Sequence, residues 1–94
     1  MNKKIKMTLV TREGCVHCAQ TKELLKKIQP EYPELVVEEI DMTTPQGQEL
    51  ISKYGIMSSP GIIINGELFS MGGTTEKELG EKLAAVRPQA RQQQ

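Results

Sequence analysis

The sequence has no excess of charge of either sign. Among its 94 residues, 12 are Lys or Arg and 12 are Asp or Glu, so the formal net charge at neutral pH is zero. A chain without net positive charge has no long-range field that gathers nucleic acid or an anionic membrane. We therefore expect neither of these among its partners.

Long hydrophobic runs are also missing. The N-terminal stretch MNKKIKMTLV contains only a broken apolar run, which is too short and too polar for a signal-peptide core or a membrane-spanning helix. We expect a cytoplasmic protein. A chain of 94 residues can build one modest core, so we look for one site on one domain.

Cysteine and histidine, the usual ligands of zinc, are few in this sequence. The two cysteines, Cys15 and Cys18, and the single histidine, His17, all lie in the stretch GCVHCA. A closed zinc site takes four Cys or His ligands, so one chain alone cannot build it from these three, although a cluster shared between two chains is not excluded by this count. A purely structural disulfide is uncommon in a reducing cytosol. A redox pair and two small buried side chains remain as interpretations.

Hydrophobic periodicity predicts the order β-α-β-α-β-β-α over one domain, residues 1–87. The predicted strands cover residues 5–10, 35–40, 62–64 and 67–70, and the helices cover about 16–29, 45–54 and 76–86. Asn65-Gly66 suits a tight type I′ turn, which makes the last two strands antiparallel, whereas the first crossover makes the first two parallel. We expect a four-stranded mixed sheet with helices on both faces, followed by a disordered tail over residues 88–94.

The predicted positions of the two cysteines explain how they can differ in reactivity. Cys15 is placed at a helix N-terminus and Cys18 one turn later on the same face, where it is covered. Free amide groups and the helix dipole stabilise a thiolate on Cys15, and a protonated His17 acts in the same direction. A thiol with a pKa of about 8.5 is a few per cent ionised at neutral pH, and a decrease of about 1.5 units makes it half ionised. Cys15 is then the nucleophile and Cys18 the resolving thiol.

Several motifs together resemble the thioredoxin superfamily. They are CVHC at a helix start, the segment SSPGIIINGELF and a GG pair before the last helix. The resemblance covers roughly residues 4–87, and the absence of an additional N-terminal strand and helix makes the size similar to that of the glutaredoxin branch. It implies a thioredoxin-like fold and a thiol-disulfide oxidoreductase that reduces or exchanges protein or glutathione mixed disulfides.

The resemblance also implies a substrate site. Ser59-Pro60 resembles the cis-proline loop that lies against the CxxC and pairs with an extended substrate. Gly72-Gly73, followed by Thr74, resembles the glutaredoxin segment that holds the γ-glutamyl end of glutathione. Arg12 occupies the place of a lysine that contacts a glutathione carboxylate. Simpler interpretations exist for the last two features. Gly72-Gly73 is then a loop that only permits a helix to start, and Arg12 is a solvated surface arginine.

At three points the sequence departs from the motifs of these related families, and the departures bear on the choice of partner. Val16 stands where relatives carry glycine or proline, and His17 stands where dithiol glutaredoxins usually carry tyrosine. A histidine there is similar to the periplasmic oxidant family, and the tryptophan of the thioredoxin WCGPC is missing. We expect a monomer without a tightly bound cofactor, with glutathione as a candidate co-substrate. The expected partners are a disulfide-containing protein or a small thiol, and an electron donor that is either glutathione or a thioredoxin-reductase-like enzyme.

Two other functions remain open. Val16 in place of proline suits an iron-sulfur carrier in which Cys15 of two chains, with glutathione, ligates a cluster. A domain that uses the same groove only to bind a partner is the non-enzymatic alternative.

Overall fold

The computed structural model describes residues 4–87, so the predicted tail, residues 88–94, lies outside the described residues. The elements follow the predicted order. They are β1 (Ile5–Thr11), α1 (Val16–Ile28), a 3-10 turn η1 (Gln29–Glu31), β2 (Leu35–Asp41), α2 (Pro45–Tyr54), β3 (Gly61–Ile64), β4 (Glu67–Met71) and α3 (Glu76–Ala85). The first strand extends one residue beyond its predicted end, through Thr11, and β4 ends at Met71 rather than Ser70.

The four strands of the described chain form one mixed sheet in the order β2-β1-β3-β4. β1 pairs with β2 in parallel, and Ile5 lies opposite Leu35. β3 pairs antiparallel with both β1 and β4. The predicted fold class is therefore confirmed, including the parallel first pair and the antiparallel hairpin.

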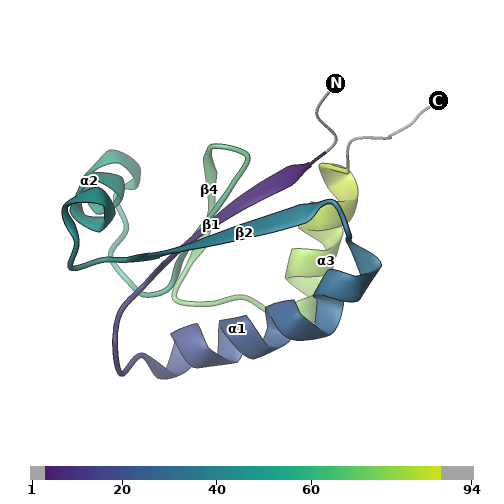
Figure 1. The fold of residues 1–94 in the computed structure, drawn as a ribbon, viewed down its shortest axis with the longest axis horizontal. Coiled ribbons are helices and arrows are strands. Elements are labelled where there is room, and N and C mark those ends of the chain that lie inside the picture. Colours follow the sequence, from purple (N-terminus) through teal and green to yellow (C-terminus); the bar gives the residue numbers. More distant parts are fainter. Residues whose placement is uncertain (1–3, 88–94) are drawn as a thin grey trace.

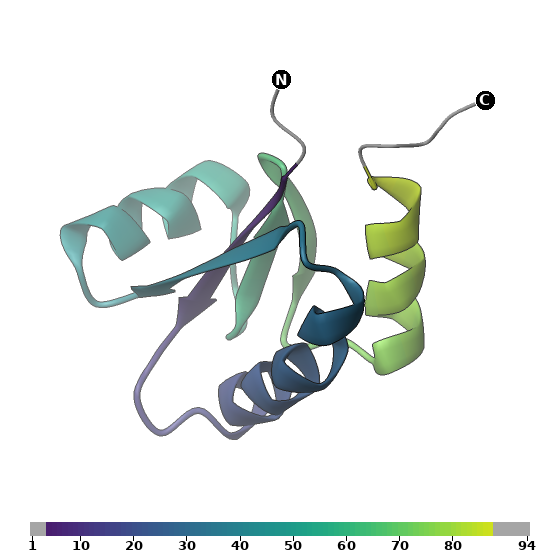
Figure 2. The same ribbon diagram turned by 45° about the vertical axis from the view of Figure 1, so that its right-hand side comes forward.

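Helices cover both faces of this sheet. Figures 1 and 2 show α1 and α3 together on one face and α2 alone on the other. Alternate residues of β1 and β3 point to opposite faces, as the strand pleat requires. Ile62 and Ile64 pack with the residues under α1 and α3, whereas Ile63 packs with those under α2.

Local sequence signals set most of the boundaries. Thr44 caps α2 by accepting a hydrogen bond from the Gly47 amide, and Thr75 and Glu78 form the predicted capping box of α3. Asn65 and Gly66 both have positive φ angles, 51° and 83°, as a type I′ turn requires. In residues 4–87, no helix combines the length and the apolar character needed to cross a bilayer.

Gly47 has a role that its helix propensity does not reveal. A Cβ atom at this position would lie 2.2 Å from the Asp41 carbonyl oxygen at the end of β2. Glycine weakens a helix in general, but here its missing side chain lets the first turn of α2 approach the sheet. Packing against β2, rather than the helix itself, requires this glycine.

Candidate functional site

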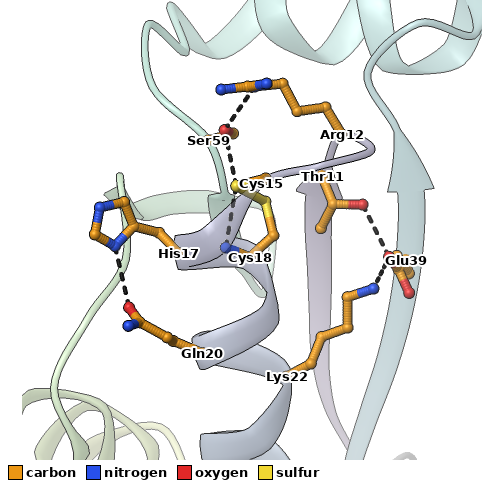
Figure 3. The surroundings of a disulfide bond; sticks show 9 residues. All are labelled: Thr11, Arg12, Cys15, His17, Cys18, Gln20, Lys22, Glu39 and Ser59. Atoms are coloured by element: carbon orange, nitrogen blue, oxygen red, sulfur yellow. Dashed lines mark hydrogen bonds and ion pairs between the residues drawn. A yellow bond between two sulfur atoms is a disulfide. The ribbon is translucent and has the colours of Figure 1, made fainter.

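The two cysteines form a disulfide where β1 leads into α1 (Figure 3). Cys15 is the N-cap residue of α1, and its sulfur accepts a hydrogen bond from the Cys18 amide at 3.0 Å. Cys15 is half-buried, whereas Cys18 is only 2% exposed. The helix N-terminus thus presents one accessible sulfur and directs an amide N–H toward it, which favours negative charge on Cys15 once the bond is reduced.

The loop before β3 lies against this disulfide. The peptide bond between Ser59 and Pro60 is cis, and Pro60 is fully buried. The Pro60 carbonyl accepts a hydrogen bond from the Gly72 amide at 2.9 Å, which connects the cis-proline loop to the segment after β4. The structure therefore brings Cys15, the cis-proline loop and the start of the GG pair together.

An open groove of about 730 Å³ runs along Cys15. Its apolar lining comes from the start of α1, from α2 and from the loops before and after α2: Val16, Met42, Ile51, Ile56 and Met57. Val16 is 67% exposed and Met57 is 86% exposed. Exposed apolar side chains beside a reactive sulfur favour contact with an apolar or extended partner segment.

Arg12 and Ser59 are linked at the edge of the groove. The Arg12 Nε donates a hydrogen bond to the Ser59 Oγ at 3.2 Å, and the Ser59 Oγ lies 3.1 Å from the Cys15 Sγ. Figure 3 shows the three side chains in line. Arg12 thus reaches the cis-proline loop in this structure.

His17 lies beside the disulfide on the exposed first turn of α1. Its Nδ1 is 3.1 Å from the Gln20 Oε1, and Figure 3 shows the ring turned away from the two sulfurs. Within the described residues, its hydrogen-bond partner is Gln20 and not Cys15. His17 still lines the groove, so it is placed to meet a bound partner.

A second hollow, of about 270 Å³, lies between α1 and α3. Gly72, Gly73 and Thr74 line it together with His17 and Thr21. Gly72 and Gly73 both have positive φ angles. At the start of α3, the Thr75 side chain accepts a hydrogen bond from the Glu78 amide, and the Glu78 side chain accepts one from the Thr75 amide. This helix end therefore presents a carboxylate as well as amide groups to the hollow.

A charged cluster lies on the opposite side of α1. The Glu39 carboxylate on β2 pairs with Lys22 at 2.7 Å and accepts a hydrogen bond from Thr11 at 2.9 Å. The Lys22 ammonium group, and then the Thr11 hydroxyl, hold the pKa of Glu39 below its usual range. Glu39 is therefore a carboxylate at neutral pH, and it fixes α1 to the end of β2. In residues 4–87, no three His, Cys, Asp or Glu side chains gather in a way that could hold a metal ion.

Comparison with known proteins identifies the family of this chain. The family model described as "Thioredoxin domain" matches residues 3–84. A thioredoxin of Methanocaldococcus jannaschii is 37% identical over 82 residues, which span 85% of this chain and 93% of that protein. The chain belongs to the thioredoxin family.

Solved thioredoxin structures agree in fold. Thioredoxin-2 of the malaria parasite has a TM-score of 0.72 at 17% identity, over 90% of this chain and 85% of that one. The oxidised form of mitochondrial thioredoxin 3 from Saccharomyces cerevisiae has a TM-score of 0.70 at 14% identity, over 88% and 79%. The predicted superfamily is confirmed. Membership of the thioredoxin family together with a CxxC pair indicates a thiol-disulfide oxidoreductase. The glutaredoxin-like subtype stays a prediction.

Some site residues of this thioredoxin-family chain were not foreseen. Met42, Ile51, Ile56 and Met57 line the groove, yet in the sequence they belong to a helix, its flanks and a loop. The one local signal is the apolar pair Ile56-Met57 immediately before SSP. The bond from Arg12 to Ser59 joins residues 47 positions apart, so sequence spacing alone does not reveal it.

Proposed function

We propose that this protein reduces disulfide bonds of partner proteins through the Cys15-Cys18 dithiol, in the reducing cytoplasm and as a monomer. The observation that carries the proposal is the unequal pair at the start of α1, in which Cys15 faces the groove and Cys18 is buried. Membership of the thioredoxin family supports the same reaction.

The reaction takes place in two exchanges. The Cys15 thiolate attacks one sulfur of the substrate disulfide, so that a mixed disulfide forms and the other substrate sulfur leaves as a thiolate. The Cys18 thiol loses its proton and attacks Cys15, which closes the intramolecular bond and releases the second substrate thiolate. The groove, with its exposed apolar side chains, and the cis-proline loop provide the surface on which a substrate segment lies. An external donor must then reduce the Cys15-Cys18 bond.

Two variants test the assigned roles. Reduction of a protein disulfide such as that of insulin is measured with the wild type, Cys15→Ser and Cys18→Ser. We expect Cys15→Ser to lose activity completely and Cys18→Ser to accumulate a mixed disulfide on Cys15, detected by mass spectrometry. Preferential alkylation of Cys18 over Cys15 in the reduced protein at neutral pH would contradict the assignment.

The electron donor is tested in the same assay. We propose a thioredoxin-reductase-like enzyme, because exposed apolar side chains lie beside Cys15 and the end of α3 that faces the second hollow already carries the Glu78 carboxylate. Glutathione is the alternative co-substrate, and Gly72, Gly73 and Thr74 would contact it. Turnover with glutathione and glutathione reductase alone, lost in Gly73→Val but kept in the distant Lys53→Gln, would favour glutathione.

The reduction potential of the couple decides the direction of the reaction. A value near that of thioredoxin, about −270 mV, supports the proposed reductant, whereas a value near about −120 mV identifies an oxidant.

A further inference from the structure

The hydrogen bonds around Ser59 have only one consistent direction. A guanidinium group has donors and no acceptor, so the Arg12 Nε–H donates to the Ser59 oxygen. A disulfide sulfur carries no proton, so the Ser59 hydroxyl donates to the Cys15 Sγ. The positive charge of Arg12 therefore polarises a hydroxyl group that points its proton at the reactive sulfur.

No other side chain in the described part of the chain is placed in this way. Besides the cysteines themselves, the charged or titratable side chains that line the two hollows at Cys15 are Arg12, Glu13, His17 and Lys22. Lys22 pairs with Glu39, and the His17 ring is bonded to Gln20. From the turn after β2, from α2 and from the loop before β3, the groove receives only apolar and hydroxyl side chains. Arg12 is thus the cation that a hydrogen-bonded path connects to Cys15.

We propose that Arg12 and Ser59 form a relay that stabilises the Cys15 thiolate, in which Ser59 is a catalytic residue that touches the reacting sulfur and Arg12 is a positioning residue that acts through it. The proposal rests on the proposed role of Cys15 as the attacking thiolate. When the disulfide takes up two electrons and one proton, Cys15 becomes a thiolate and Cys18 a thiol. The Ser59 hydroxyl then donates to a full negative charge, which strengthens the bond.

The relay also predicts a change during the reaction. When Cys15 attacks the substrate disulfide, its negative charge passes to the leaving sulfur and Cys15 becomes neutral in the mixed disulfide. Ser59 then donates to an uncharged sulfur again, so the relay favours the thiolate over both disulfide states. It makes Cys15 ionised at a lower pH, and it makes the Cys15-Cys18 disulfide easier to reduce.

The test is the pH profile of Cys15 alkylation by iodoacetamide in the reduced protein, with mass spectrometry to separate the two cysteines. For Ser59→Ala we expect the rate below the wild-type midpoint to fall about tenfold, because a hydrogen bond to a charged group is lost. The rates should converge at high pH, where Cys15 is ionised in every variant. Ser59→Thr, which keeps the hydroxyl group, should stay within about threefold of the wild type.

A double-mutant cycle shows whether Arg12 acts through Ser59. We expect Arg12→Gln to lower the alkylation rate at low pH about threefold in the wild-type background and to have no effect in the Ser59→Ala background. Lys53→Gln removes the same charge from α2, away from the groove, and should leave the profile unchanged. An equal effect of Arg12→Gln in both backgrounds would show a long-range charge effect and overturn the relay.

Substrate kinetics distinguish a relay from a substrate contact. A Ser59→Ala variant that raises the KM for a protein disulfide but keeps the wild-type alkylation profile would overturn the proposal. Alkylation uses neither a disulfide substrate nor an electron donor. The relay can therefore fail while the reductase activity is found, and it can be supported in a protein that reduces no disulfide.

Discussion

The two faces of the sheet are packed very differently. Ten buried residues form the core between the sheet and the helices α1 and α3, whereas three, Val10, Ile56 and Ile63, form the core under α2. The groove beside Cys15 takes Met42, Ile51 and Ile56 from this second face. The face under α1 and α3, here called the dense face, supplies most of the hydrophobic stabilisation. The face under α2, the thin face, leaves apolar side chains available at the site.

Neighbouring residues of β3 allow the most direct test of this difference. Ile62 and Ile63 are both buried, but their side chains belong to the cores of opposite faces. We expect Ile62→Ala to lower the free energy of unfolding by about 4 kcal/mol and Ile63→Ala by about 2 kcal/mol, because the smaller core can collapse around the cavity. Urea unfolding of the oxidised proteins measures both values, and equal losses would disprove the contrast.

Two helical glycines provide the next comparison. Gly47→Ala places a Cβ atom 2.2 Å from the Asp41 carbonyl oxygen, whereas a Cβ atom at Gly80 on α3 meets no atom within 4 Å. We expect Gly47→Ala to destabilise the protein by roughly 2 kcal/mol and Gly80→Ala to stabilise it by about 0.5–1 kcal/mol. Thermal unfolding of both variants checks these opposite signs. A stabilised Gly47→Ala protein would mean that α2 moves easily away from the sheet.

Besides Glu39, two acidic residues at the two ends of β2, Glu34 and Asp41, have a lowered pKa. The Arg87 guanidinium lowers the pKa of Glu34, and the side-chain and backbone groups of Thr43 lower that of Asp41. A carboxyl whose pKa is lower in the folded state stabilises the protein above its unfolded-state pKa, and this contribution is lost as the pH falls through the folded-state pKa.

Unfolding as a function of pH separates the two acids. We expect Glu34→Gln to be less stable than the wild type at pH 7, and we expect the two stability curves to converge as the pH falls from about 5 toward 3. Asp41→Asn should behave in the same way with a smaller difference, because Asp41 is exposed and its partner Thr43 is neutral. A constant offset between wild type and Glu34→Gln over this pH range would contradict the assigned cause.

The smallest effect is expected from an exposed ion pair on the dense face. Lys27 on α1 and Glu76 on α3 pair at 3.1 Å, with side chains 68% and 55% exposed. A double-mutant cycle with Lys27→Ala and Glu76→Ala should give a coupling energy of under about 0.5 kcal/mol, because water and salt screen the pair. A larger value that persists at high salt would show that this pair, and not only the apolar core, holds α1 to α3.

The sequence predicted the features that depend on neighbours along the chain. Asn65-Gly66 determined the hairpin, Thr75 with Glu78 determined the start of α3, and the alternation in residues 5–10 determined the first strand, because each signal acts within a few residues. The same locality placed Cys15 at a helix start and Cys18 one turn later. The family resemblance added the expectation of a cis peptide bond before Pro60, which the structure shows and which no local signal gives.

Tertiary structure alone decided what joins distant segments. The link from Arg12 to Ser59, the close approach of Gly47 to Asp41 and the groove that places Met57 beside Cys15 all depend on how the elements pack. Packing also decided that α2 covers a smaller core than α1 and α3. The sequence determines which residues form each element. The distances between residues far apart in the chain depend on the close packing of the whole core.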